Sequence, residues 1–266
     1  MELVRLRSRA LLASMLLLAA APAAGRLKRR VPTFEPTDLE LEDAHVLELD
    51  MQVGVVFRDD APKTRVFVPD YELDYGLTER VELNIDGAIA LDREDGHWVG
   101  TADPLWTCVK LGFLSEKDAD RPEQSYGLGA QLGPRLPTTA HSYGTGFGAV
   151  LLAARMAAPW HVILNAGGVL EPLDHTQPER SAAVLGGIDL DYDLDRVDRW
   201  SLLAELGGSY SLGPDPNDVH ATLGLDFVST AWLDLSLVGF YGFLPGGDRA
   251  GVFLGFAPKL ALAGTR

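Results

Sequence analysis

The chain has no apolar segment long enough to cross a membrane as a helix. Its most apolar segment, Ala10–Ala20, falls short of the roughly 20 residues that a spanning helix needs. A mean hydropathy of +0.05 is also too low for a helical membrane protein, although 47% of the residues are hydrophobic. Outside this N-terminal segment, entry into a membrane therefore needs strands rather than helices.

Cysteine and positive charge are also scarce. The one cysteine, Cys108, cannot form a disulfide within the chain, and we expect it to be a small buried residue of a strand. The 23 basic residues are outnumbered by 38 acidic ones, so the formal net charge is -15. Because nucleic acid binds basic surfaces, this excess of acid excludes it as an expected partner.

Residues 1–24 have the organisation of a secretory signal peptide. Three arginines precede the apolar segment Ala10–Ala20, and small residues around Ala21-Pro22-Ala23 offer a cleavage site. The alternative is a membrane anchor helix, for which the apolar segment is short. Basic residues follow directly, so the sequence leaves the cleavage position open. We predict a cleaved signal peptide at 1–24 and a periplasmic N-terminal segment at 25–44.

Apolar residues alternate with polar or small ones through the rest of the chain. In His45–Phe57 they occupy every second position, which is the period of a strand with one apolar and one polar face. The pattern recurs to the C-terminus and predicts an all-β fold. We expect an antiparallel, up-and-down transmembrane β-barrel of about 12 strands over residues 45–266, in the outer membrane of a Gram-negative bacterium. The expected strands are 45–57, 65–76, 80–92, 99–114, 125–136, 146–156, 160–170, 181–194, 199–211, 219–228, 231–243 and 250–261.

Short and long connections are expected to alternate, as periplasmic turns and external loops do in outer-membrane barrels. With twelve strands, both termini then lie on the side of the short turns. Ser115–Gln124 is an exception, because it is long where a short turn is due. The short connections are Gly76–Glu79, Ala157–Pro159, Asp195–Asp198 and Ser229–Thr230, and the long ones are 58–64, 93–98, 137–145, 171–180, 212–218 and 244–249.

Aromatic residues mark the ends of the predicted strands. Trp160 and Trp200 begin strands after short turns, whereas Tyr210 and Tyr241 lie at the opposite ends, which predicts one aromatic ring at each membrane interface. Trp232 does not alternate in step with the apolar residues of its predicted strand, so it is a candidate for the lumen. A soluble β-barrel or sandwich would show the same alternation with its apolar face inside. The polar face is rich in Gly and Ser rather than Lys and Glu, which favours the membrane barrel.

The segment Tyr71–Leu83, YELDYGLTERVEL, resembles the strand, Tyr-Gly-Leu-Thr turn and following strand of the MetA-pathway-of-phenol-degradation family of outer-membrane transporters. Asp103–Gly112, Leu136-Pro137-Thr138 and Tyr143–Gly168 resemble further family segments in the same order. The resemblance implies a twelve-stranded barrel and the passage of small hydrophobic or aromatic molecules. It implies no catalytic residues.

No pattern predicts catalysis, and we expect no enzyme activity, cofactor or metal. The aspartates of Asp189–Asp195 lack the Gly and Glu of a calcium loop and are interpreted as an acidic stripe on one strand face. The six histidines show no metal-ligand spacing. His141 and Ser142 are the adjacent pair that a lipid-modifying enzyme would need, but neighbours on a strand point to opposite sides.

The predicted inward positions are mainly acidic, so the interior would repel anions and favour cations or neutral polar solutes. We expect a passive channel for small molecules, whose partners are outer-membrane lipids, the barrel-assembly machinery and the solute. The alternative is a closed barrel with a structural or interaction role, since a twelve-stranded barrel is intermediate in width. The candidate lumen and selectivity residues are Glu48, Asp50, Asp189, Asp191, Glu205, Asp226, Lys110, Arg135 and Arg155.

Overall fold

A computed structural model describes residues 41, 44–58, 64–94, 96–118, 121–157, 159–175, 179–194, 200–213, 215–230, 232–244 and 248–261. The proposed signal peptide and most of the proposed periplasmic segment lie outside the described residues. The strands are β1 (Val46–Arg58), β2 (Thr64–Thr78), β3 (Val81–Glu94), β4 (His97–Ala102), β5 (Leu105–Asp118), β6 (Arg121–Leu136), β7 (Ser142–Tyr143), β8 (Gly146–Ala157), β9 (Trp160–Leu170), β10 (Leu173–Asp174), β11 (Ala182–Asp193), β12 (Trp200–Ser211), β13 (Asp218–Thr230), β14 (Leu233–Gly242) and β15 (Asp248–Ala261).

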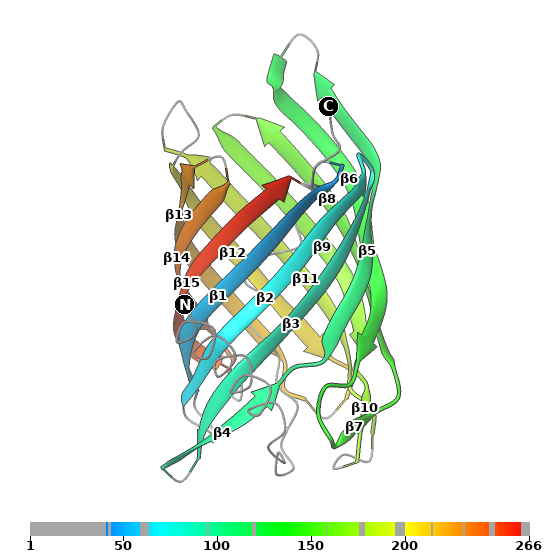
Figure 1. Ribbon diagram of the computed structural model, residues 1–266, viewed down its shortest axis with the longest axis vertical. Helices are drawn as coiled ribbons and strands as arrows, with labels where there is room; N and C mark the ends of the chain where they lie inside the picture. The colour runs from blue at the N-terminus through cyan, green and yellow to red at the C-terminus, as the bar shows by residue number, and fades with distance from the viewer. Residues whose placement is uncertain are drawn as a thin grey trace, which may run out of the picture.

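Twelve of these strands form a closed antiparallel barrel, which confirms the predicted fold class (Figure 1). The barrel closes where β1 pairs with β15, with Leu47 opposite Leu260 and Val55 opposite Val252. Every barrel strand then has two neighbours, so the barrel has no unpaired edge. β7 and β10 form a separate two-stranded sheet within the connections.

The predicted strand 99–114 is two strands, and the prediction of a single strand there is wrong. β4 pairs with the second half of β3, whereas β5 pairs with the first half. The chain breaks between them at Asp103-Pro104, because proline cannot donate a hydrogen bond to a strand ladder. The amide of Asp103 instead donates to the carbonyl of Ala88 at 3.0 Å.

The predicted long connection Ser115–Gln124 is also wrong. β5 continues to Asp118 and β6 begins at Arg121, so only residues 119–120 separate them. This hairpin extends beyond the rim of the barrel (Figure 1). The alternation of short turns and longer loops therefore has no exception at this place.

The two ends of the barrel differ. We call the end where β1 begins and β15 finishes the turn end, and its connections are residues 79–80, 119–120, 158–159, 194–199 and 231–232. The opposite end is the loop end, whose connections include β4, β7 and β10. As predicted, both ends of the barrel sequence lie at the turn end.

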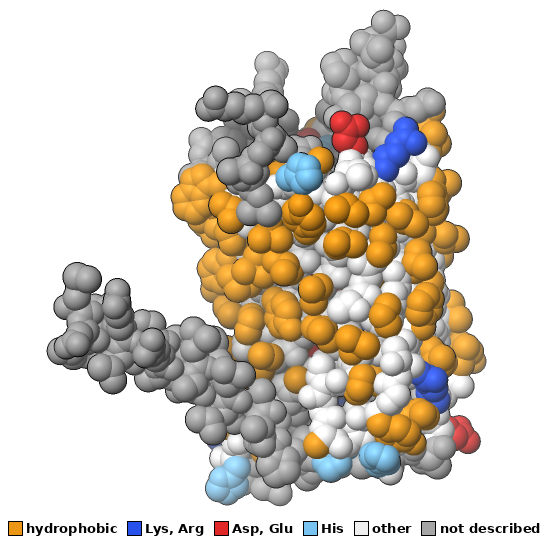
Figure 2. Space-filling model, turned by 45° about the vertical axis from the view of Figure 1, so that its right-hand side comes forward, with side chains coloured by type: hydrophobic (Ala, Val, Ile, Leu, Met, Phe, Trp, Pro, Cys, Tyr) orange, Lys and Arg blue, Asp and Glu red, His pale blue; other side chains and the backbone are white. Residues whose placement is uncertain are grey.

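The outer face of the wall is apolar. Figure 2 shows hydrophobic side chains over the wall on the face in view, with charged side chains near the two ends. In the described part of the chain, no helix has the length and apolar character needed to cross a membrane. Exposed apolar side chains come from most barrel strands and include Val53, Leu83, Leu128, Leu151, Leu164, Val184, Leu206, Leu223, Leu237 and Val252.

Candidate functional site: the barrel interior

The inward face of the barrel is divided into zones. In β1, Glu48 is buried inside while Val53 and Phe57 are exposed on the outside, and the register extends this parity to the neighbouring strands. The half nearer the turn end is acidic. Its inward acids are Glu48, Asp50, Asp70, Glu72, Asp74, Glu82 and Asp86 on β1 to β3, and Asp189, Asp191, Asp193, Glu205, Asp226 and Asp234 on β11 to β14.

Two lysines offset part of this negative charge. Lys110 Nζ lies 3.5 Å from Glu82 Oε1, and Lys259 Nζ lies 3.1 Å from Glu48 Oε2. Both pairs join residues directly opposite each other on adjacent strands. Each lysine is therefore paired with one acid along the wall of the zone.

Asn84 holds part of the acidic zone in place. Its amide nitrogen donates to Asp74 Oδ1 at 2.6 Å and also to Glu72. The thiol of Cys108 donates to Asn84 Oδ1 at 3.0 Å and accepts from Gln131 at 2.9 Å. Cys108 is buried, as predicted, and it joins the polar wall of β3 to that of β6.

The acids on the other wall are only partly buried. Asp189 and Asp191 point inward, opposite Ile163 and His161 of β9, and each is partly exposed. Asp50 and Glu72 on the first wall are also partly exposed. Inward side chains of a closed barrel can be exposed only to space inside it, so the acidic zone borders space within the barrel.

A water-excluded apolar cluster lies in the half nearer the loop end. The ring centroids of Phe67 and Phe253 are 5.6 Å apart, and those of Phe240 and Phe253 are 6.1 Å apart. Phe67 is 0% exposed and Phe253 2%. The cluster comprises Val56, Phe67, Ala88, Ala90, Phe240 and Phe253, which come from β1, β2, β3, β14 and β15.

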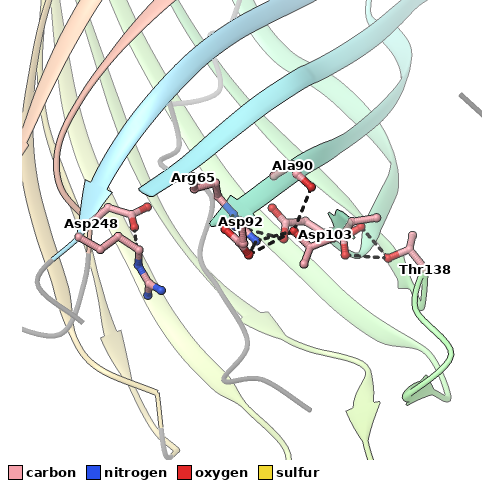
Figure 3. Close-up of polar contacts among 9 residues, drawn as sticks. Arg65, Ala90, Asp92, Asp103, Thr138 and Asp248 are labelled. Carbon is pink, nitrogen blue, oxygen red and sulfur yellow. Dashed lines mark hydrogen bonds and ion pairs between the residues drawn. The ribbon is translucent and has the colours of Figure 1, made fainter. Parts of the chain in front are cut away.

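Arg65 lies between this cluster and the loop end (Figure 3). Its guanidinium donates two hydrogen bonds to Asp92, at 2.9 and 3.1 Å, and one to Thr101 at 2.8 Å. Asp103 lies 3.9 Å away, and the hydroxyl of Thr138 donates to the Asp103 carbonyl at 2.8 Å. Arg65 therefore connects β2 with β3, β4 and Asp103, and Thr138 connects Asp103 with the segment that follows β6.

Further ion pairs lie near the loop end. Arg58 Nε is 2.9 Å from Asp248 Oδ1 (Figure 3), and Arg135 Nε is 3.0 Å from Glu171 Oε2. His220 on β13 lies between two carboxylates, with Nδ1 2.6 Å from Asp218 and Nε2 3.4 Å from Glu205. The mouth at this end is therefore lined by paired charges, unlike the predominantly acidic turn-end half.

Most of the predicted lumen residues lie on the inward face, but Arg155 does not. Arg155 is exposed and pairs with Tyr126 and Val162 on the outside, so its predicted inward position is wrong. Its strand carries apolar side chains on both faces, such as Val150 inside and Leu151 outside, and this obscured the alternation. Arg135 faces inward but lies at the loop-end mouth.

The predicted interface aromatics are exposed on the outer face. Trp160 and Trp200 lie at the turn end, while Tyr210 and Tyr241 lie toward the loop end. Trp232 is also exposed. It lies in the turn before β14 rather than within the strand, so strand parity does not place it in the lumen.

His141 and Ser142 lie in the connection between β6 and β8. Ser142 Oγ shares a hydrogen bond with Thr139 Oγ1 at 2.9 Å, and the carbonyl of His141 accepts from the amide of His175 at 3.0 Å. Among the described residues, no three His, Cys, Asp or Glu side chains are grouped so as to hold a metal ion.

Sequence reasoning missed the inward positions of Arg65 and Phe67. If the alternation were continuous and placed Asp70 and Glu72 inside, it would place Arg65 and Phe67 outside. A bulge between Phe67 and Asp70 adds one residue to β2 and reverses the parity. Pro69 was the available signal, because a proline within a strand commonly marks a bulge.

The closed barrel, apolar exterior and polar interior define a transmembrane β-barrel of the outer-membrane type. No protein-family model matches the chain, and no curated protein sequence matches it. Among solved structures, it is similar to the CymD monoaromatic hydrocarbon channel, with 12% identity, a TM-score of 0.45 and coverage of 86% of this chain and 91% of that one.

Two other solved structures are similar at the same level. The translocator domain of the autotransporter NalP from Neisseria meningitidis is 13% identical, with a TM-score of 0.44 and coverage of 80% of this chain and 87% of that one. A loop-deletion mutant of OmpT, an outer-membrane protein of Vibrio cholerae, is 10% identical, with a TM-score of 0.42 and coverage of 81% and 99%. At identities of 10–13%, these similarities concern the fold alone.

Proposed function

We propose that this protein is an outer-membrane channel for the passive passage of small molecules. The observation that supports it best is the partial exposure of inward acids such as Asp50, Glu72, Asp189 and Asp191, since space inside the membrane barrel is the first requirement of a channel. The proposal includes export by the signal peptide at 1–24 and insertion by the barrel-assembly machinery, with lipid around the apolar wall.

The acidic zone gives the channel its selectivity. Carboxylates that line a narrow passage attract cations and repel anions, and neutral polar solutes pass without a charge penalty. The resemblance at Tyr71–Leu83 adds small hydrophobic or aromatic molecules to the candidate solutes. These solutes can be compared by the swelling of vesicles that contain the protein.

Neutralising the acids on one wall tests this function. Asp189→Asn, Asp191→Asn and Glu205→Gln together are expected to reduce the preference for K⁺ over Cl⁻ by about twofold or more in planar bilayers. The control removes equal charge outside the barrel wall, by Glu79→Gln, Asp174→Asn and Glu179→Gln. Equal selectivity in the unmodified protein and both variants would contradict the proposed role of the acids.

The alternative is a closed barrel with a structural or interaction role. The water-excluded cluster around Phe67 and Phe253 favours it, because side chains there fill part of the interior. The two functions differ in one measurement on the unmodified protein. A channel gives reproducible single-channel steps in a bilayer, whereas a closed barrel that is correctly inserted gives none.

A further inference from the structure

The apolar cluster occupies one side of the barrel. Its strands, β14, β15, β1, β2 and β3, follow one another in the sheet, so the three phenylalanines project from a single continuous stretch of wall. They lie between the acidic zone at the turn end and the Arg65 ion pairs at the loop end. A solute that travels from one end to the other must pass them.

Glycines on neighbouring strands set the position of two of these rings. A Cβ atom on Gly54 would lie 2.3 Å from Cδ1 of Phe253, and one on Gly251 would lie 2.2 Å from Cε1 of Phe240. Each ring therefore lies over the backbone of the adjacent strand. The guanidinium of Arg65 is 5.4 Å from the ring centroid of Phe67 and covers the third ring.

The rest of the wall has several inward glycines in the same half of the barrel, beside larger inward side chains such as Gln131, Val150 and Leu152. Gly187 and Gly207 are directly opposite each other on β11 and β12. At Gly187 an added Cβ would meet Cα of Gly207 and the carbonyl of Leu206 at 3.6 Å, which is ordinary contact. The inward glycines in this half are Gly133, Gly148, Gly167, Gly187 and Gly207.

We infer that Phe67, Phe240 and Phe253 form the constriction that limits the rate of passage. Because these rings are almost fully buried, solutes pass along the wall across the barrel from them, where Gly187 is partly exposed. The inference rests on the proposed channel function and specifies where permeation is limited. An apolar constriction opposes hydrated ions because water leaves it readily, whereas the acidic zone beside it holds cations. The constriction therefore limits the rate, and the acids determine the sign of the charge that passes.

Removing rings tests one side of the constriction. The double variant Phe240→Ala, Phe253→Ala is expected to raise single-channel conductance for K⁺ by about twofold or more, because the passage becomes wider and less apolar. The matched control is Phe256→Ala, since Phe256 lies on the same strand as Phe253 but faces outward. The control is expected to conduct like the unmodified protein.

A larger side chain at Gly187 tests the facing wall and leaves the apolar cluster unchanged. Gly187→Leu is expected to lower K⁺ conductance by about twofold or more, because its side chain projects into the passage. The control is Gly186→Leu on the outward face, where an added Cβ meets Asn165 O at 3.7 Å. Different gel mobilities of unboiled and boiled samples verify that each variant is folded.

The outcomes separate this inference from the proposed function. If the unmodified protein conducts and neither inward substitution changes its conductance, the constriction lies elsewhere and the channel function stands. If the unmodified protein is silent and the double phenylalanine variant conducts, the rings are the barrier and passive passage is wrong for the native protein. Folded proteins that are all silent would overturn both.

Discussion

Arg65 is a buried positive charge that is stabilised by its ion pair with Asp92. Its side chain is 3% exposed and that of Asp92 2%, so both charges have lost nearly all contact with water. The two parallel hydrogen bonds to Asp92 have the geometry that a guanidinium and a carboxylate prefer. A charge buried in this way is tolerated only while its partner is present, because it would otherwise lack compensation for its lost hydration.

Asp92→Asn is therefore expected to destabilise the barrel by about 3 kcal/mol, since it removes the carboxylate that accepts two hydrogen bonds from the buried guanidinium and leaves only Asp103 at 3.9 Å. Urea unfolding in lipid vesicles measures the change. The control is Glu48→Gln, which removes the carboxylate opposite Lys259, whose side chain is 36% exposed. That change is expected to cost about 1 kcal/mol or less. Equal costs at the two sites would show that burial does not determine the strength of the Arg65 pair.

At the scale of whole strands, the sequence predicted the features that follow from a regular alternation of apolar and polar residues. The number of barrel strands, the alternation of turns with loops and the inward positions of Glu48 and Asp189 follow from a period of two. The parity of β2 before Asp70 does not follow from it, because one extra residue reverses the facing of Arg65 and Phe67. Tertiary pairing decides where such a residue is placed, so the apolar cluster and the Arg65 ion pairs were not predicted.

The bulge in β2 predicts that the side chain of Val66 faces the lipid. With Cys108→Ser as the background, Val66→Cys is expected to react with a membrane-soluble thiol reagent and to resist a charged one, as Leu73→Cys should. Glu72→Cys, on the inward face, is expected to react with the charged reagent. Labelling in intact vesicles measures all three. If Val66→Cys behaves like Glu72→Cys, β2 has a single parity and Phe67 faces lipid.

At the scale of the whole molecule, charge is distributed unevenly along the barrel. The turn-end half carries most of the inward acids, whereas near the loop end Arg58, Arg65 and Arg135 are each paired with a carboxylate. The apolar cluster separates these two regions. The net charge of -15 is therefore not spread evenly, because some of the excess acidic residues line the turn-end half of the interior.

This distribution predicts that selectivity depends on salt. Charges that act through solvent are screened over about 10 Å at 0.1 M salt and about 3 Å at 1 M. If Asp50, Glu72, Asp189 and Asp191 attract cations through water in the passage, the preference for K⁺ over Cl⁻ should be clear at about 0.1 M KCl and should largely disappear at about 1 M. Reversal potentials across a planar bilayer measure it.

The variant with Asp189, Asp191 and Glu205 neutralised provides the internal control. It should begin with a weaker preference at low salt and change less as the salt concentration rises, because fewer charges remain to be screened. A preference that stays constant from low to high salt would contradict the mechanism. Selection would then depend on direct contact with the wall at the constriction, where the three phenylalanines lie, rather than on the acidic half.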